Sequence, residues 1–187
     1  MITNLFWIIR SRDKEMKEEQ LKNIWSRLTE EERKEVDKLL KAKTVPNVLK
    51  EAFQLQRIFI QDESKLKVLF STRRAAKSYT AGLYLVKTAL ERKGTSSVYI
   101  GLTRDQSKRL IWSDILKEII KKYDISANFN ETELTITFSN GSIIYVLAVD
   151  DSDAQKDKLL GKKYALAIID EAASYNIDLK DLVFKIL

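Results

Sequence analysis

Two short polar clusters, far apart along the chain, could together bind a nucleotide. Lys77 and Ser78 follow the apolar run 68–70. In a phosphate-binding loop, a lysine lies against the β- and γ-phosphates and the next serine places its hydroxyl on Mg²⁺. Asp170 and Glu171 follow a second, longer apolar run. In a nucleotide hydrolase, an aspartate at that place supports Mg²⁺ and its waters, and the neighbouring glutamate polarises the attacking water.

Each cluster alone has a simpler interpretation. A phosphate-binding loop usually contains glycine, so that its backbone N–H groups can close around an anion. Residues 71–78 contain none, and Ala75 and Ala76 stand where glycines are expected. Asp170 and Glu171 also suit the first turn of a helix, where acidic side chains are favourable. The combination of both clusters, each after an apolar strand, predicts a site for Mg²⁺ and a nucleotide.

Composition narrows the available chemistry. The 187 residues include no cysteine and no histidine, which excludes disulfides, thiolate chemistry, imidazole catalysis and histidine-ligated metals. The net charge of +6 mildly favours polyanionic partners. The apolar run 5–9 is too short to span a bilayer and lacks the flanks of a signal peptide. We therefore expect no membrane association and a cytosolic location.

The first part of the chain predicts a helical extension over residues 1–50. Apolar residues recur with helical spacing from about residue 14. Thr29 and Glu32 have the spacing of a capping box that starts a second helix. A third helix is expected over residues 47–58, after Pro46. This surface would serve as a docking or DNA-contacting arm, or simply as a solvated extension that covers the core.

The remainder, residues 51–187, predicts an α/β domain with a mostly parallel sheet flanked by helices. A type I′ turn is expected at Asn140–Gly141, and a central parallel strand follows the hairpin. Ligands of such sheets bind beyond the carboxyl ends of the strands, which is where the polar clusters fall. In chain order, the expected elements are a strand at 68–70, a helix at 78–91, a strand at 97–103, a helix at 105–122, a hairpin at 133–148 and a strand at 164–169.

An ordered set of segments resembles the ATPase domains of the large terminase subunits of tailed bacteriophages, over roughly residues 52–174. That family has a deviant phosphate loop of the form Ser/Thr-Arg-Arg/Gln-x-Gly/Ala-Lys-Ser/Thr. The matching segments here are the loop Thr72-Arg73-Arg74-Ala75-Ala76-Lys77-Ser78, the strand and Thr-Arg ending at 98–104, the hairpin at 138–142, and the glycine-to-Asp-Glu segment at 160–172. The resemblance implies a P-loop NTPase fold of the ASCE type.

The resemblance also implies a function, an ATP-driven motor that threads double-stranded DNA into a capsid. The implied cofactors are ATP and Mg²⁺, with Ser78 and Asp170 holding the metal. Glu171 would be the catalytic carboxylate, and Arg73 would sense or neutralise the γ-phosphate. The nucleotide would be bound by Thr72, Arg73, Arg74, Ala75, Ala76, Lys77 and Ser78, and its adenine by Gln56, with Gln54 as the alternative.

Further expectations follow from the resemblance. The implied partners are double-stranded DNA, a portal protein and a small terminase subunit, in a ring of identical subunits in the cytoplasm of the bacterial host. The chain stops soon after Glu171, at Leu187, before the family's coupling motif, last strands and nuclease domain. We therefore expect a fragment of a longer protein or a reduced relative, which binds nucleotide better than it hydrolyses it.

Two departures from the family pattern carry expectations of their own. Ala76 occupies the place of the second loop glycine, so we expect its backbone to approach phosphate without a positive φ. Leu160 stands where some members have a trans-acting arginine. Arg104 or Arg109 could supply that charge instead.

Two other functions remain open. A superfamily 2 helicase-like ATPase shares an upstream glutamine and the Asp-Glu-Ala sequence, but it would need Gly-Lys-Thr in the loop. A degenerate, non-hydrolysing nucleotide-fold module for scaffold or portal docking would explain the loop without glycine. Binding of Mg²⁺–ATP separates the docking module from both ATPases.

Overall fold

The computed structural model describes residues 23, 25–34, 46–72, 74–148 and 162–175. The chain divides into two compact units, Met1–Val45 and Pro46–Leu187, which we describe separately. In the first unit the predicted capping box is confirmed. The backbone N–H of Thr29 donates to the Glu32 carboxylate at 2.9 Å, and the N–H of Glu32 donates to Thr29 Oγ1 at 3.3 Å. The other helical expectations before Pro46 fall mostly outside the described residues.

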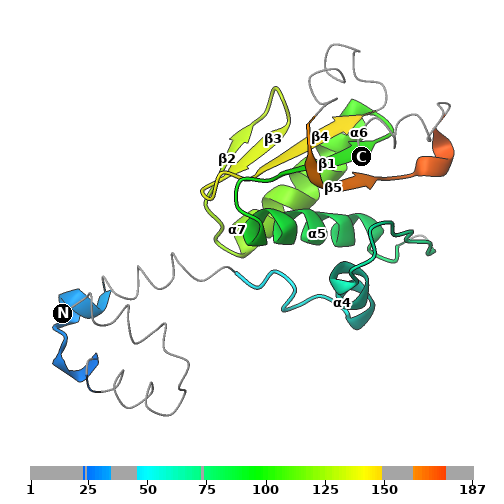
Figure 1. The fold of residues 1–187 in the computed structure, drawn as a ribbon. Helices are drawn as coiled ribbons and strands as arrows, with labels where there is room; N and C mark the ends of the chain where they lie inside the picture. Colours follow the sequence, from blue (N-terminus) through cyan, green and yellow to red (C-terminus); the bar gives the residue numbers. More distant parts are fainter. Residues whose placement is uncertain (1–22, 24, 35–45, 73, 149–161, 176–187) are drawn as a thin grey trace. The chain divides into compact units, whose positions relative to one another are not determined.

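The second unit is built on a five-stranded sheet in the order β2-β3-β4-β1-β5 (Figure 1). β1 pairs in parallel with β4 and β5, whereas β2–β3 and β3–β4 are antiparallel. The sheet is therefore mixed, and the expectation of a mostly parallel sheet was too strong. The strands are β1 (Ser96–Gly101), β2 (Ala127–Asn130), β3 (Thr135–Phe138), β4 (Ile143–Ala148) and β5 (Tyr164–Ile169).

The β3–β4 hairpin is confirmed, but its turn is not of type I′. A type I′ turn needs positive φ at both central residues, and of Asn140 and Gly141 only Gly141 has one, at 83°. The N–H of Gly141 donates to the carbonyl of Phe138, and the N–H of Phe138 donates to the carbonyl of Ser142. This pattern fits a three-residue loop whose last residue is a left-handed glycine.

Two long helical segments pack together beside the sheet. α5 (Lys77–Glu91) follows the candidate phosphate loop, as predicted, and contacts β1, β4 and β5. The predicted helix after β1 is present as a continuous run of α6 (Arg104–Ser107), the π-helical η1 (Lys108–Leu116) and α7 (Lys117–Lys122). Apolar side chains from these helices and from the sheet form the core, with Leu83, Val86, Ile111, Trp112, Leu116, Ile119, Ile136, Ile144 and Val146 among the buried residues.

The helix expected at residues 47–58 begins later. Residues 48–51 form turns, and α4 spans Gln54–Gln61. The backbone of Phe53 is extended, with ψ of 156°, so the preceding turn does not continue into α4 as one helix. α4 lies against the first part of α5, and none of the described helices is long and apolar enough to cross a membrane.

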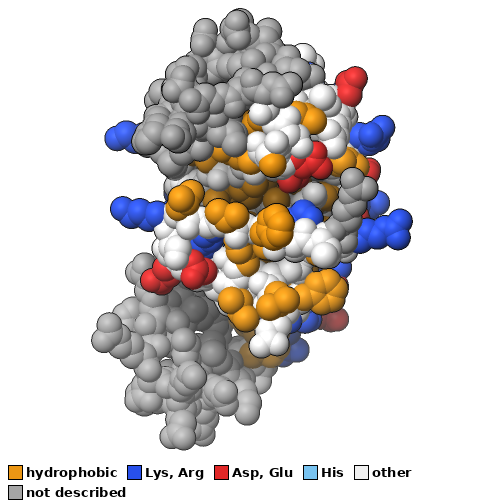
Figure 2. All heavy atoms as spheres, turned by 90° about the vertical axis from the view of Figure 1, so that its right-hand side faces the viewer, with side chains coloured by type: hydrophobic (Ala, Val, Ile, Leu, Met, Phe, Trp, Pro, Cys, Tyr) orange, Lys and Arg blue, Asp and Glu red, His pale blue; other side chains and the backbone are white. Residues whose placement is uncertain are grey.

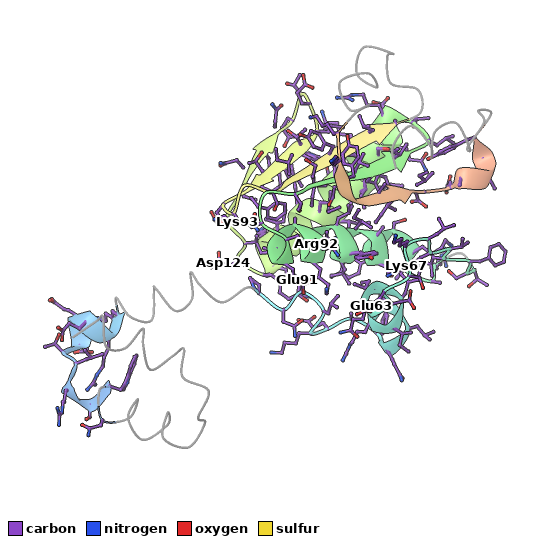
Figure 3. All side chains as sticks on the ribbon, in the orientation of Figure 1. Glu63, Lys67, Glu91, Arg92, Lys93 and Asp124 are labelled. Carbon is purple, nitrogen blue, oxygen red and sulfur yellow. The ribbon has the colours of Figure 1, made fainter. Side chains whose placement is uncertain are left out.

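The strand expected at 68–70 was wrong. This run has no strand partner among the described residues, and Val68 and Phe70 are 83% and 98% exposed. Lys67 lies between α4 and α5 (Figure 3), where its ammonium donates to the Phe59 carbonyl at 3.0 Å and to the Tyr84 hydroxyl at 3.1 Å. Lys67 therefore anchors the chain to the two helices. The run 68–70 is apolar, but without a neighbouring strand to hydrogen-bond with it cannot form a strand.

β5 also differs from its expected place. It is parallel to β1, as predicted, but it ends the row of described strands instead of lying inside it. Its residues are only half-buried, although the sequence of β5 is entirely apolar apart from its tyrosine. Figure 2 views the molecule from the right-hand side of Figure 1 and shows many hydrophobic side chains on that face.

Candidate nucleotide site

Two residues of the candidate phosphate loop have the positive φ that glycine usually adopts, although the loop contains no glycine. Ala76, the N-cap of α5, has φ 54° and ψ 31°, and Arg74 has φ 63°. The expectation that Ala76 would avoid positive φ was therefore wrong. Left-handed backbone costs a non-glycine residue about 1–2 kcal/mol, and strain of this kind persists only where the surrounding structure imposes it. Here the carbonyl of Ala76 accepts bonds from the backbone N–H and the hydroxyl of Thr80, both at 2.9 Å.

The side chain of Lys77 folds back over the start of the loop. Its ammonium donates to the carbonyls of Ser71 and Thr72, at 3.1 and 2.9 Å. An ammonium has three N–H donors, so these bonds leave one for a phosphate oxygen. The first N–H groups of α5 add an anion-binding helix N-terminus directly beside this lysine.

The structure brings the two sequence clusters together. Ser78, in the first turn of α5, donates its hydroxyl to Asp170 Oδ2 at 3.4 Å, across 92 residues of chain. Asp170 directly follows β5, and its own N–H donates to the carbonyl of Ile100 in β1 at 3.0 Å. The predicted proximity of a loop hydroxyl and a strand-end carboxylate is present in the structure.

A tyrosine that the sequence analysis treated only as part of a strand completes this cluster. The Tyr99 hydroxyl donates to Asp170 Oδ2 at 2.6 Å, and Tyr99 is 5% exposed. Its position in β1 lies opposite Ile168 of β5, so its side chain extends toward the end of β5. The sequence offered only a general indication of this contact, because the hydroxyl of a tyrosine in a buried strand usually has a hydrogen-bonding partner.

A tight turn follows β5 and carries Glu171. Glu171 is exposed and has φ 52°, a left-handed conformation. Its N–H donates to Asp170 Oδ1 at 3.0 Å, and its carbonyl accepts from Ser174 at 2.8 Å. The Tyr175 hydroxyl lies 2.9 Å from the carbonyl of Ile100 and 2.7 Å from that of Asp170, which ties the turn to the end of β1. A strained glutamate beside a held aspartate is an arrangement expected of a functional site.

Burial keeps the phenols of this cluster protonated. Burial raises the pKa of Tyr99, and the hydrogen bond to Asp170 raises this pKa further. Burial also raises the pKa of Tyr175, helped by the negative charges of Asp170 and Glu171. Both hydroxyls are therefore neutral donors at physiological pH.

The predicted adenine-binding glutamines lie on α4. Gln56 is buried, and both ends of its amide are used. Its Oε1 accepts from the N–H of Phe53 at 2.9 Å, and its Nε2 donates to Thr80 Oγ1 at 2.9 Å. Gln56 thereby links α4 to the first turn of α5. Gln54, the alternative, is exposed.

The structure gives little information on the predicted roles of the arginines. Arg73 lies outside the described residues. Arg104 begins α6 at the carboxyl end of β1, and its guanidinium donates to the carbonyl of Thr132 at 2.6 Å. Arg109 is exposed on η1. Leu160 also lies outside the described residues.

The donor set fits a magnesium–nucleotide complex better than a metal held by protein alone. No group of three or more acidic side chains that could hold a metal occurs in the described part of the chain. Mg²⁺ typically uses one or two carboxylates together with substrate phosphates and waters. One hydroxyl from Ser78 beside one carboxylate from Asp170, next to a helix N-terminus, meets that requirement.

The fold is similar to solved terminase domains. The large terminase ATPase domain of Thermus phage P74-26 matches with a TM-score of 0.54 and 19% identity, over 66% of this chain and 54% of that one. An arginine-to-alanine mutant of the same domain matches with a TM-score of 0.53 and 19% identity, over 66% and 55%. The chain thus spans little more than half the length of these domains, and at this identity the likeness shows the fold.

Sequence comparison gives the family. No match was found among curated proteins. The family model described as "Phage terminase large subunit" matches residues 63–186, which is well over half of the chain and includes both the candidate phosphate loop and the Asp170–Glu171 pair. The chain therefore belongs to the phage terminase large-subunit family.

Proposed function

We propose that this chain binds and hydrolyses ATP with Mg²⁺ as the motor part of a viral DNA-packaging machine. The observation that supports this function most directly is the contact of Ser78 with Asp170 at the end of the phosphate loop. Membership of the terminase family supports the packaging role. Neither feature alone would distinguish an ATPase from a nucleotide-fold docking module.

Each group at the site has a role in this proposal. Lys77 and the N-terminus of α5 bind the β- and γ-phosphates. Ser78 and Asp170 hold Mg²⁺, which neutralises charge on the phosphates. Glu171 accepts a proton from the attacking water, and Arg73 stabilises the γ-phosphate. Adenine is read from the side of α4, where Gln54 offers an exposed amide and Gln56 holds the helix in place.

The proposed partners follow from the family. They are double-stranded DNA, a portal protein and a small terminase subunit, with several copies of the chain in a ring in the host cytoplasm. Residues 51–187 would supply the ATPase domain and residues 1–50 a helical extension. Arg104 or Arg109 would act on the nucleotide of a neighbouring copy.

ATP binding tests the first step. Calorimetry with ATP and Mg²⁺ should show binding in the wild type and its loss in Lys77→Ala. Lys87→Ala is the matched control, because Lys87 lies on the same helix but pairs with Glu91 at 2.5 Å, away from the loop. Wild-type protein that binds no ATP would leave the docking module as the better interpretation.

Hydrolysis tests the second step. Glu171→Gln should retain ATP binding and slow single-turnover hydrolysis by about 10²–10⁴-fold, the range for loss of a general base. Glu118→Gln, an exposed change on α7, serves as the control. Unchanged hydrolysis in Glu171→Gln would remove Glu171 from the catalytic role. Stimulation by double-stranded rather than single-stranded DNA would favour packaging over a helicase.

A further inference from the structure

Among the described residues, three hydrogen bonds reach the Asp170 carboxylate, and the one from the Tyr99 hydroxyl is the shortest. Tyr99 and Ser78 both donate to Oδ2, at 2.6 and 3.4 Å, while the N–H of Glu171 donates to Oδ1 at 3.0 Å. A length of 2.5–2.7 Å is typical of a charge-assisted O–H···O⁻ bond, which is about twice as strong as a neutral one. Tyr99 is therefore the main side-chain constraint on the orientation of this carboxylate.

The Tyr99 phenol is itself held rigidly. Tyr99 lies in β1, which is hydrogen-bonded to β4 on one side and to β5 on the other. Its side chain is almost fully buried, so few rotamers are open to it. Asp170, the acceptor, directly follows β5, and β5 pairs with β1, which carries Tyr99. A donor fixed in the sheet thus sets the position of an acceptor at the sheet's edge.

Ser78 constrains this carboxylate less than Tyr99 does. Its contact to Asp170 is long, at 3.4 Å, and in the proposed function its hydroxyl oxygen also binds Mg²⁺. The bond from Glu171 engages the other carboxylate oxygen and comes from a strained turn. Only Tyr99 among these donors stays independent of the phosphate loop and of the turn.

We propose that Tyr99 is a positioning residue that holds the Asp170 carboxylate in the orientation required to receive the magnesium–nucleotide complex. This inference rests on the proposed ATPase function, since it assigns a role within the same site. Its specific consequence concerns the metal. Loss of the hydroxyl weakens the contribution of Mg²⁺ to ATP binding, while the contacts of ATP with the loop and the helix N-terminus remain.

The test compares ATP binding at a series of Mg²⁺ concentrations with binding in EDTA. In Tyr99→Phe, the Mg²⁺ concentration for half-maximal ATP binding should rise about tenfold, as expected for a hydrogen bond to a charged group. Affinity in EDTA should stay within about twofold of wild type. Tyr145→Phe is the matched control, because Tyr145 belongs to the same sheet and its hydroxyl accepts from Lys162 at 2.9 Å instead.

A second comparison shows whether the effect passes through Asp170. In an Asp170→Asn background, the further change Tyr99→Phe should alter the Mg²⁺ requirement by less than about twofold, because coupled residues give non-additive effects. An unchanged Mg²⁺ requirement in Tyr99→Phe would overturn the inference. So would an equal loss of affinity in EDTA, or loss of the folded state by circular dichroism, since either assigns the hydroxyl a structural role.

The same data separate this inference from the proposed function. Wild-type protein that binds no ATP at any Mg²⁺ concentration would contradict the proposed function, and the role of Tyr99 would fall with it. Wild-type protein that binds ATP with Mg²⁺, together with a Tyr99→Phe variant that behaves identically, would contradict the role of Tyr99 alone.

Discussion

Ala76 and Arg74 hold the backbone of the phosphate loop in the left-handed region that glycine usually occupies. The Ala76 carbonyl accepts two bonds from Thr80 at the start of α5. Ala75, between them, has no positive φ. The loop therefore keeps its shape at the cost of local strain, which concentrates at defined residues.

Replacing Ala76 with glycine should relieve this strain. Ala76→Gly gains about 1–2 kcal/mol from the relaxed backbone and loses about 0.4–1 kcal/mol through the more flexible unfolded chain. Ala75→Gly has only the destabilising effect of the more flexible unfolded chain, so this variant should be less stable than Ala76→Gly by about 1–2 kcal/mol. Urea denaturation of the two variants measures the difference. Equal stabilities would mean that Ala76 is not strained.

At the scale of elements, α5 and η1 approach each other closely at Gly82. A Cβ on Gly82 would lie 2.3 Å from Ile115 Cγ2 and 3.2 Å from Ile119 Cδ1. Helix propensity alone favours alanine over glycine by about 1 kcal/mol, whereas overpacking costs about 1–3 kcal/mol. The contact should decide the outcome, because Ile115 is held within the π-helical segment.

Gly82→Ala should therefore destabilise the protein in spite of its better helix propensity. The double change Gly82→Ala with Ile115→Ala removes the clashing methyl group. The destabilisation of the double variant should therefore be smaller than the sum of the two single destabilisations by about 1 kcal/mol or more. Thermal and urea unfolding give all the values of this cycle. Strict additivity would show that α5 and η1 are not in close contact at this point.

The exposed run 68–70 gives a second prediction at this scale. Val68 and Phe70 point away from the core, with 83% and 98% of their surfaces exposed. Phe70→Ser should change the free energy of unfolding by less than about 0.5 kcal/mol, as for other surface substitutions. Ile144→Ser, at a fully buried position in β4, provides the contrast. A loss above about 2 kcal/mol in Phe70→Ser would indicate that this run is packed as a core strand.

For the whole molecule, buried tyrosines predict how stability responds to alkaline pH. An unfolded tyrosine has a pKa near 10. Burial raises the pKa of Tyr99 and Tyr175 above this value, and it raises the pKa of Tyr164 to about 12. Above pH 10 the folded state thus binds more protons than the unfolded state, so the free energy of unfolding falls as pH rises.

Tyr99→Phe should make this fall less steep. The variant lacks one raised pKa, while every other titratable group is the same in both proteins. Denaturant titrations at pH 8 to 11 give the two slopes, and below pH 10 the difference in stability between the proteins should be constant. Parallel curves up to pH 11 would mean that Tyr99 titrates alike in the folded and unfolded chain.

Local patterns were enough to predict most elements of the α/β unit. The apolar period of residues 78–91 predicted α5, and the alternation of 133–138 predicted the hairpin, because these elements satisfy their own hydrogen bonds or pair with a neighbour in sequence. The same reasoning missed β2 and the shift to π-helix in η1. It also assigned a strand to 68–70, since an apolar run indicates burial without showing which partner would provide it.

The residues that could do chemistry follow from the amino-acid sequence alone: a lysine and a hydroxyl after one apolar run, an aspartate and a glutamate after another, and no imidazole or thiol. How these residues meet depends on the packing of the chain. Pairing of β1 with β5 places Asp170 beside Tyr99, and the position of α5 brings Ser78 to the same carboxylate. These contacts join residues more than 70 positions apart, and such contacts depend on chain packing, which no local pattern encodes. The left-handed Ala76 was equally hidden, because alanine alone would avoid this conformation and no local pattern marks it.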